Sequence, residues 1–421
     1  MKTVNQSIIR IGLPFAMLFI SLSWCSCQKT NTDSIVDEEE ELVPDLPYTI
    51  VGTNQSLFFN NTSEITEPQS GDAFFGQNAN YQGLAQHYRD NGDGTISDLN
   101  TGLMWQQDPG EKVTYDDALA GANDINLGGY NDWRLPSIKE LYSLMQFNGT
   151  DPSAYDASTT NSIVPFINDE YFNFTYGDPD AGDRIIDSQY ATSNIDVGDS
   201  NFGGGNLMFG VNFADGRIKG YPTGARPGQT TGKLFCVLYV RGNTNYGVND
   251  FVDNGDGTIS DRATGLMWMM NDNAEGVTWE SALSYAENLE LAGHDDWRLP
   301  DAKELQSILD YTRAPGTTNS AAIHPLFKAS EIINEDGQDD YAYYWSSTTH
   351  MNHKNGGQNA VYFSFGRALG YFNGQWMDVH GAGAQRSDPK SGDANDWPYG
   401  HGPQGDAIRI LNFVRCVRTV K

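Results

Sequence analysis

The side chains best suited to chemistry are concentrated in one segment near the end of the chain, residues 378–406, which reads DVHGAGAQRSDPKSGDANDWPYGHGPQGD. Its carboxylates are hard oxygen ligands of the kind that calcium prefers. The candidate calcium ligands are Asp388, Asp393, Asp396 and Asp406. Calcium is thus a possible cofactor. The alternative is an ordered surface loop pinned by internal Asp–Arg pairs, because a long loop without its own core is either functional or disordered.

Direct ligand binding by this segment is a second hypothesis. The rings of Trp397 and Tyr399 could stack on the face of a sugar, and glycine-rich backbone can approach a ligand closely. The candidate ligand-binding residues are His380, Arg386, Asp388, Lys390, Trp397, His401 and, from the separate motif YWSST, Trp345. A zinc site could use His350, His353, His380 or His401, but their spacing matches no zinc motif.

The stretch DNGDGTISD occurs twice, at residues 90–98 and 253–261, and looks like a calcium loop. An EF-hand loop needs an oxygen ligand at position 1, Gly at position 6 and Glu at position 12. With Gly94 at position 6, Arg89 takes position 1 and Asn100 takes position 12, and the second copy fails in the same way. The Asn-Gly and Asp-Gly pairs instead predict a tight β-hairpin.

These stretches belong to a tandem duplication. DNGDGTISDLNTGLMW returns as DNGDGTISDRATGLMW with two differences, DWRLP occurs twice, and FCVLYVRG corresponds to VRCVRTVK at the end of the chain. At 421 residues the chain is long enough for two domains, each with its own core. We place the first domain at residues 73–242 and the second at 245–421.

Each copy predicts the same elements. The hairpin and the following LMW form a β-meander, two helices come next, and further short strands with long loops complete an α+β fold. The expected helix N-caps are Thr114 and Ser137 in the first copy and Thr278 and Asp301 in the second. Asp132 and Asp296 are expected to fix the turn before the second helix.

The N-terminus predicts an export signal. An apolar run at residues 11–24 follows Lys2 and Arg10, so residues 1–26 are expected to be a lipoprotein signal peptide with Cys27 as the lipidated residue. Residues 27–72 are rich in acidic side chains and predict a flexible tether. We therefore expect a lipid-anchored protein of the bacterial outer membrane or cell surface, the alternative being a periplasmic or secreted one. A net charge of −29 argues against nucleic acid as a partner.

The ordered motifs GQNANYQG, DNGDGTISD, TGLMW, DWRLP, KEL, YWSST, FGRALGY and RCVR resemble the Lcl C-terminal domain family, in two copies. The resemblance implies a fold like that of C-type lectins and formylglycine-generating enzymes. It also implies an extracellular module that binds glycan, including polyanionic glycan, or another extracellular ligand such as a protein. It implies no defined reaction.

The two copies differ most after residue 371, where the second copy has the segment 378–406 and the first has the short PTGARPGQTTGK. We therefore expect any site in the second copy. The first hypothesis is an adhesive binding module. The alternative is a metal-dependent enzyme, or a structural component, with its site in 378–406. Cys236 and Cys416 occupy equivalent places in the two copies and are expected to be buried free thiols.

Overall fold

The computed structural model describes residues 46–153, 155, 163–198, 206–225, 230 and 232–420, all within one compact unit. The predictions for the signal peptide, for Cys27 and for the first part of the tether lie outside the described residues. Within the described ranges, no helix combines the length and the apolar character that a bilayer crossing requires.

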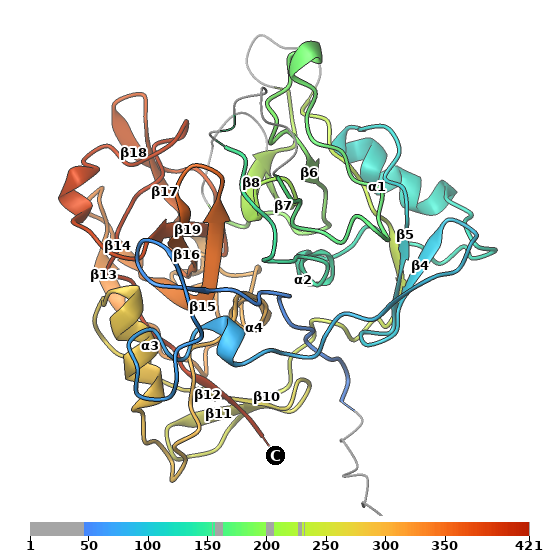
Figure 1. Cartoon of the computed structure of the whole chain (residues 1–421). Coiled ribbons are helices and arrows are strands. Elements are labelled where there is room, and N and C mark those ends of the chain that lie inside the picture. The colour runs from blue at the N-terminus through green and yellow to red at the C-terminus, as the bar shows by residue number, and fades with distance from the viewer. Residues whose placement is uncertain are drawn as a thin grey trace, which may run out of the picture. The chain divides into compact units, whose positions relative to one another are not determined.

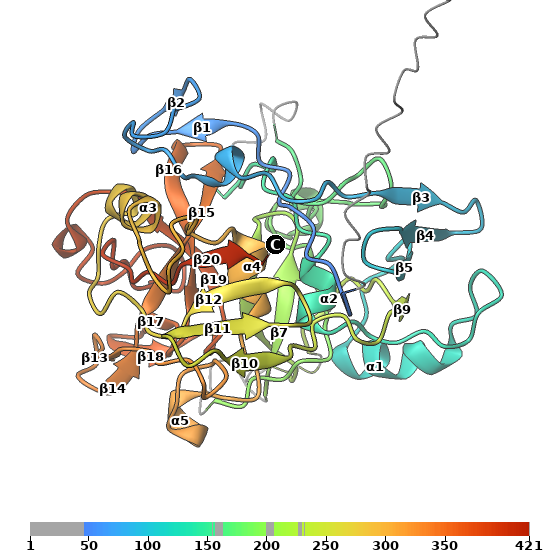
Figure 2. The ribbon, with the colours of Figure 1, turned by 90° about the horizontal axis from the view of Figure 1, so that it is seen from below.

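The predicted β-meander is present in both copies, and in each the last strand of the copy joins it (Figure 2). In register, Ile96 pairs with Trp105 and Ile259 pairs with Trp268, and both tryptophans are fully buried. The strands of the first copy are β3 (Tyr88–Asp90), β4 (Thr95–Asp98), β5 (Leu103–Gln106) and β9 (Val240–Gly242). Those of the second are β10 (Phe251–Asp253), β11 (Thr258–Asp261), β12 (Leu266–Met269) and β20 (Val417–Thr419).

The DNGDGTISD stretches are hairpin corners. The carboxylate of Asp90 accepts the backbone N–H of Gly92 at 2.8 Å, and that of Asp93 accepts both the N–H and the hydroxyl of Thr95. Gly92 and Gly94 have φ values of 74° and 86°, which glycine adopts without strain. The carboxylates therefore bind their own turn, and the hairpin prediction is confirmed.

The four predicted helices begin where their capping residues indicate. Ser137 accepts the N–H of Glu140 while the Glu140 carboxylate accepts the N–H of Ser137, and Asp301 with Glu304 repeats this capping box. Thr114 caps the first helix of its copy by accepting the N–H of Asp117. The helices are α1 (Tyr115–Asp124), α2 (Ile138–Tyr142), α3 (Trp279–Glu287), α4 (Ala302–Ser307) and α5 (Pro315–Thr318).

A central sheet joins the two copies (Figure 1). Its strand order is β15-β16-β19-β8-β7-β6, and β19 of the second copy pairs with β8 of the first through Gln385 and Ile218. Its strands are β6 (Gln189–Tyr190), β7 (Leu207–Asn212), β8 (Arg217–Pro222), β15 (Tyr343–Asn352), β16 (Gly356–Ser364) and β19 (Gln385–Pro389). The segment 378–406, expected to be a long loop, thus contributes a central strand.

The largest hydrophobic cluster contains residues of both copies, among them Leu141 of α2, Leu305 of α4 and Phe363 of β16. The ring of Tyr142 meets that of Phe363 edge to face, with 6.1 Å between centroids. Each copy also has a smaller cluster of its own, as the sequence predicts, and the largest cluster is shared because the central sheet gives α2 and α4 a common surface to cover.

Residues 46–72 are packed, which corrects the prediction that the flexible tether extends to residue 72. Tyr48, Val51 and Phe59 are buried. The side-chain amide of Gln55 donates to the carbonyl of Thr349 at 2.7 Å and accepts the N–H of the same residue at 2.8 Å. The tether was predicted from the acidic composition of the whole stretch, residues 27–72. Its later part nevertheless contains enough apolar side chains to pack against the rest of the chain. It includes β1 (Phe58–Phe59) and β2 (Glu64–Ile65).

The remaining elements are short. Two hairpins of the second copy are β13 (Glu331–Ile333) with β14 (Asp339–Tyr341) and β17 (Leu369–Phe372) with β18 (Gln375–Asp378). The 3-10 helices are η1 (Asn78–Asn80), η3 (Pro179–Ala181) and η4 (Ala394–Asp396).

Candidate functional site

A cavity of about 420 Å³ lies where β8 and β19 meet. Both copies contribute to its wall: Asp151, Asp215, Arg217 and Lys219 come from the first copy, and Tyr362, Arg386, Trp397, His401 and Asp406 come from the second. The cavity is therefore formed by the pairing of the two copies and belongs to neither alone.

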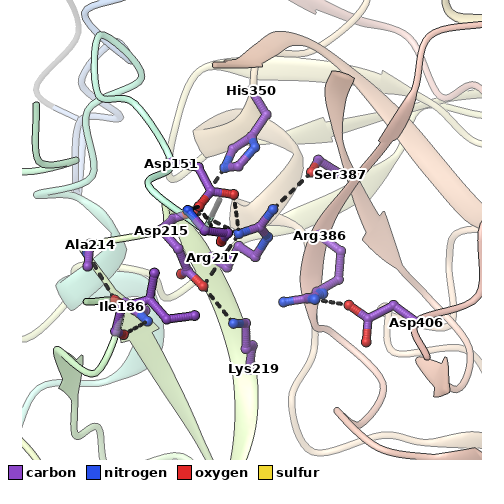
Figure 3. Close-up of polar contacts among 12 residues, drawn as sticks. Asp151, Ile186, Ala214, Asp215, Arg217, Lys219, His350, Arg386, Ser387 and Asp406 are labelled. Atoms are coloured by element: carbon purple, nitrogen blue, oxygen red, sulfur yellow. Dashed lines mark hydrogen bonds and ion pairs between the residues drawn. The ribbon is translucent and has the colours of Figure 1, made fainter. Parts of the chain in front are cut away.

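Three charged residues of the first copy lie in the cavity wall. Arg217 and Lys219 are two positions apart in β8 and therefore share a face of the strand, while Asp215 lies in the turn that precedes β8. Lys219 Nζ lies 2.6 Å from Asp215 Oδ2, and Arg217 Nη1 lies 2.6 Å from Asp151 Oδ2 (Figure 3). Arg217 thus lies between two carboxylates, which raise its pKa against the opposing effect of burial.

The charge of Arg386 is neutralised less completely than that of Arg217. Its guanidinium contacts Asp406 through Nη2, while Nε and Nη1 are buried and have no hydrogen-bond partner among the described residues (Figure 3). Burial, and then the neighbouring charge of Arg217, lower the pKa of Arg386 to about 10. A buried donor without an acceptor costs free energy, so the site would be stabilised by a ligand that supplies one.

Lys219 and His350 also have lowered pKa values, so the site disfavours their charged forms. Burial lowers the pKa of Lys219 to about 7, with Arg386 and Arg217 adding to the effect against the attraction of Asp215. Burial and then Arg217 lower the pKa of His350 to about 4. The His350 ring lies behind the cavity, with Nε2 2.9 Å from the carbonyl oxygen of Asp215. The crowding of cations favours an anionic ligand over a further cation.

The structure brings together only part of the predicted ligand-binding set. Arg386, Trp397 and His401 line the cavity. His380 is buried behind them, with Nε2 3.0 Å from Asp406 Oδ1, and burial holds its pKa well below the ordinary value. His380 therefore orients Asp406, and through Asp406 it supports Arg386.

Three predicted residues lie elsewhere, which corrects their assignment to the site. Trp345 is fully buried and its Nε1 donates to the carbonyl of Val277 at 2.9 Å. Lys390 is buried, lies 3.9 Å from the ring centroid of Trp279 and donates to a threonine hydroxyl. Asp388 is fully buried in the protein interior. All three hold the fold together.

The four predicted calcium ligands do not converge. Asp388 accepts the backbone N–H groups of Arg409 and Ile410, each at 3.0 Å, Asp393 caps η4, and Asp406 pairs with Arg386. Within the described ranges, no group of three or more His, Cys, Asp and Glu side chains could hold a metal ion. The structure therefore does not bring these residues together as a calcium or zinc site. The reason is that β19 and η4 divide the segment.

Other structural predictions are confirmed. Cys236 and Cys416 are buried free thiols. Asp132 forms a two-point ion pair with Arg241, and Asp296 forms the same pair with Arg418. These pairs tie the DWRLP turn to the last strand of each copy.

Sequence reasoning missed Asp151, Asp215, Arg217 and Lys219. A signal was present in the two versions of one motif, FADGRIKGY at 213–221 and FSFGRALGY at 363–371. Phe365 and Leu369 stand in the second copy where the first has Asp215 and Lys219. The first copy thus carries the polar version, which corrects the expectation of a site in the second copy alone.

The fold and cavity define a mixed α and β protein, mostly strands with few helices, made of two tandem copies of one unit with a polar cavity between them. The chain belongs to the Lcl C-terminal domain family, whose model matches residues 94–237 and 257–380. The two matches confirm the family and the duplication inferred from the motifs. No curated protein gives a significant match. The second match ends before Arg386 and Trp397, so these two cavity residues lie beyond the matched region.

Proposed function

We propose that the protein is a surface-anchored lipoprotein whose two copies together form a binding module for a glycan that carries acidic groups. The observation that carries this proposal is Arg386 in the wall of a cavity that also contains Trp397: two of its donor nitrogens are buried and have no partner within the described ranges. Membership of the Lcl C-terminal domain family supports it, because the resemblance implies a C-type-lectin-like fold and an extracellular binding role.

The chemistry of the cavity suits a carboxylate or a sulfate. A guanidinium binds either group through parallel N–H donors, which gives both strength and direction. Trp397 is half-buried and offers an aromatic surface on which the C–H face of a pyranose ring can stack. A volume of about 420 Å³ lies within the about 300–1,000 Å³ range of small-molecule sites.

The position of the module follows from the N-terminus. The proposed signal peptide and the lipid on Cys27 would hold residues 46–420 at the outer surface of the cell, linked by residues 28–45. A lipid anchor and an acidic linker place the cavity in contact with extracellular material. Adhesion is the role that this arrangement supports.

Binding to immobilised polysaccharides tests the proposal. Hyaluronan offers carboxylates, chondroitin sulfate offers carboxylates and sulfates, and dextran is the uncharged reference. We expect binding to at least one acidic polysaccharide and none to dextran, with at least tenfold weaker binding by Arg386→Gln. Arg262→Gln, which removes a surface arginine paired with Asp250 outside the cavity, is the matched control and should bind normally. Equal binding by Arg386→Gln and the unmodified protein would refute the assignment of the site.

A metal-independent enzyme is the second candidate, favoured by Lys219. A lysine with a pKa of about 7 is partly neutral at physiological pH and can act as a base or a nucleophile, and this one lies in the cavity wall. Mass spectrometry of chondroitin sulfate oligosaccharides after prolonged incubation would detect turnover. Product formed by the unmodified protein and not by Lys219→Met would establish catalysis, and unchanged oligosaccharides would leave binding as the function.

A further inference from the structure

A second hollow adjoins the cavity. This groove, of about 650 Å³, is lined by Trp376, Trp397, Ile408 and Arg409, with Ile333 and Leu411 at its apolar sides. Trp397 and Ile408 line both the groove and the cavity, so the two spaces meet at these side chains. A ligand that extends beyond the cavity past Trp397 enters the groove.

We propose that the groove is a second subsite, which binds an uncharged pyranose unit of the same glycan whose acidic unit occupies the cavity. The inference rests on the proposed function and deepens it, because it assigns the ligand a length and an order of units. The recognised element is at least two sugars, one acidic and the next uncharged.

The aromatic side chains of the groove are held in position by neighbouring rings. Trp376 lies in β18 and is half-buried, and its ring meets that of Tyr371 at 5.3 Å between centroids. Tyr371 in turn contacts Tyr399 at 4.9 Å. Because neighbouring rings hold Trp376, little side-chain entropy is lost when a sugar stacks on it.

On the polar side of the groove, Arg409 is a hydrogen-bond donor whose charge is neutralised by Glu335. The guanidinium of Arg409 lies over the ring of Tyr343, 3.6 Å from its centroid, and two of its nitrogens bind Glu335 at 2.8 and 2.9 Å. Its Nη1 is buried and has no hydrogen-bond partner among the described residues. Because Glu335 neutralises Arg409 through two contacts, the groove favours a hydroxyl or amide oxygen over an anion, in contrast to Arg386.

An apolar groove could also receive a peptide. Ile333 and Leu411 are 67% and 53% exposed, which would suit either occupant. The shared wall at Trp397 favours the sugar, because a glycan held in the cavity presents its next unit at this place. Trp397 and Ile408 also lie beyond the second family match, and Trp397 lies in the segment 378–406 that distinguishes the second copy from the first.

Calorimetric titration with two probes tests the inference. Glucuronic acid is one acidic sugar and fills the cavity alone, whereas hyaluronan tetrasaccharide alternates acidic and uncharged sugars and can fill both spaces. For Trp376→Ala we expect an affinity for the tetrasaccharide lowered about tenfold, which corresponds to about 1.4 kcal/mol, with unchanged affinity for glucuronic acid. Tyr130→Ala removes a partly exposed aromatic ring of the first copy, outside both the cavity and the groove. It is the matched control and should leave the affinity for each probe unchanged.

Each other outcome overturns the inference in a recognisable way. If Trp376→Ala binds the tetrasaccharide as the unmodified protein does, the groove is not a subsite although the cavity remains one. If it loses both probes equally, the two spaces are not separate. Failure of both probes with the unmodified protein also overturns the inference, and the polysaccharide panel then shows whether the proposed function fails with it. Leu411→Asn, a change at an exposed wall of the groove, should act in the same direction as Trp376→Ala and covers the case in which that variant does not fold.

Discussion

Arg386 of β19 stands opposite Arg217 of β8, because the preceding residue, Gln385, pairs with Ile218 in antiparallel register. Like charges directly opposite each other across a strand pair are destabilising. Arg217 has two carboxylate partners. Arg386 has one carboxylate partner, and two of its nitrogens are unpaired in the part of the chain that the structure describes. The joint between the two copies therefore carries an electrostatic cost that an anionic ligand would relieve.

Anions should stabilise the protein through Arg386. We expect chondroitin sulfate to raise the melting temperature, since a ligand that binds only the folded state adds about 2.7 kcal/mol at a hundred times its Kd. Arg386→Gln should show a much smaller shift than the unmodified protein and Arg262→Gln. The measurement is thermal unfolding with and without the ligand. An equal shift in all three proteins would place the anion elsewhere.

Lys219 should make stability depend on pH. Its pKa is lowered to about 7 in the folded protein from 10.5, so between these values the unfolded chain binds the extra proton and stability rises with pH. Burial also lowers the pKa values of Lys139, to about 8, and of Lys303, so both contribute in the same direction. Lys219→Met should reduce the rise by up to about 1.4 kcal/mol per pH unit.

Urea unfolding at pH 7, 8.5 and 10 measures the effect of Lys219→Met. Lys112→Met, a change on a lysine with a partly exposed side chain, is the matched control and should keep the slope of the unmodified protein. If Lys219→Met also keeps that slope, Lys219 is charged in the folded state and the electrostatic account of the cavity is wrong.

The packed segment 46–72 should contribute to stability through Gln55. Gln55→Ala removes two hydrogen bonds to the backbone of Thr349 and leaves a buried carbonyl and a buried N–H unpaired. We expect a loss of about 1–3 kcal/mol in the free energy of unfolding, measured with urea. Gln69→Ala, at an exposed position of the same segment, should change it little. Equal stability of both variants would mean that the segment is not held by this contact.

The shared core should make the two copies unfold together. Phe363→Ala, in the cluster that contains residues of both copies, should cost about 3–5 kcal/mol. Calorimetry should show one transition for the unmodified protein and one, at lower temperature, for the variant. Two resolved transitions, with only one of them shifted, would show that the copies are independent domains.

The lipid anchor should depend on Cys27. We expect Cys27→Ser, expressed in a bacterium that processes lipoproteins, to leave the membrane fraction and appear in soluble fractions, because the modified thiol is lost. Cys25→Ser is the matched control, since it removes the neighbouring thiol, and should remain in the membrane. Retention of Cys27→Ser with the membrane would contradict the assignment.

Local features of the fold could be predicted from sequence because each rests on a few neighbouring residues. The hairpin at Asp90–Asp98 follows from its Asn-Gly and Asp-Gly pairs, and α2 follows from the capping box of Ser137 and Glu140. The duplication followed from repeated motifs. None of these inferences required knowledge of which distant strands pair.

The joint between the copies could not be predicted in this way. The pairing of Gln385 with Ile218 joins residues far apart in sequence. Without knowledge of this pairing, the sequence predicts Arg386 to lie in a loop and Asp388 to be a free carboxylate. The same pairing brings Arg217 and Lys219 into one cavity with Arg386. The site was therefore predicted only on its second-copy side, where the composition is unusual.

The decisive experiment is a structure of the protein with a chondroitin sulfate disaccharide bound. We expect density in the cavity between β8 and β19, with a carboxylate or sulfate oxygen within hydrogen-bond distance of the Arg386 guanidinium and a sugar ring against Trp397. A ligand bound elsewhere, or one in the cavity whose acidic groups point away from Arg386, would contradict this expectation.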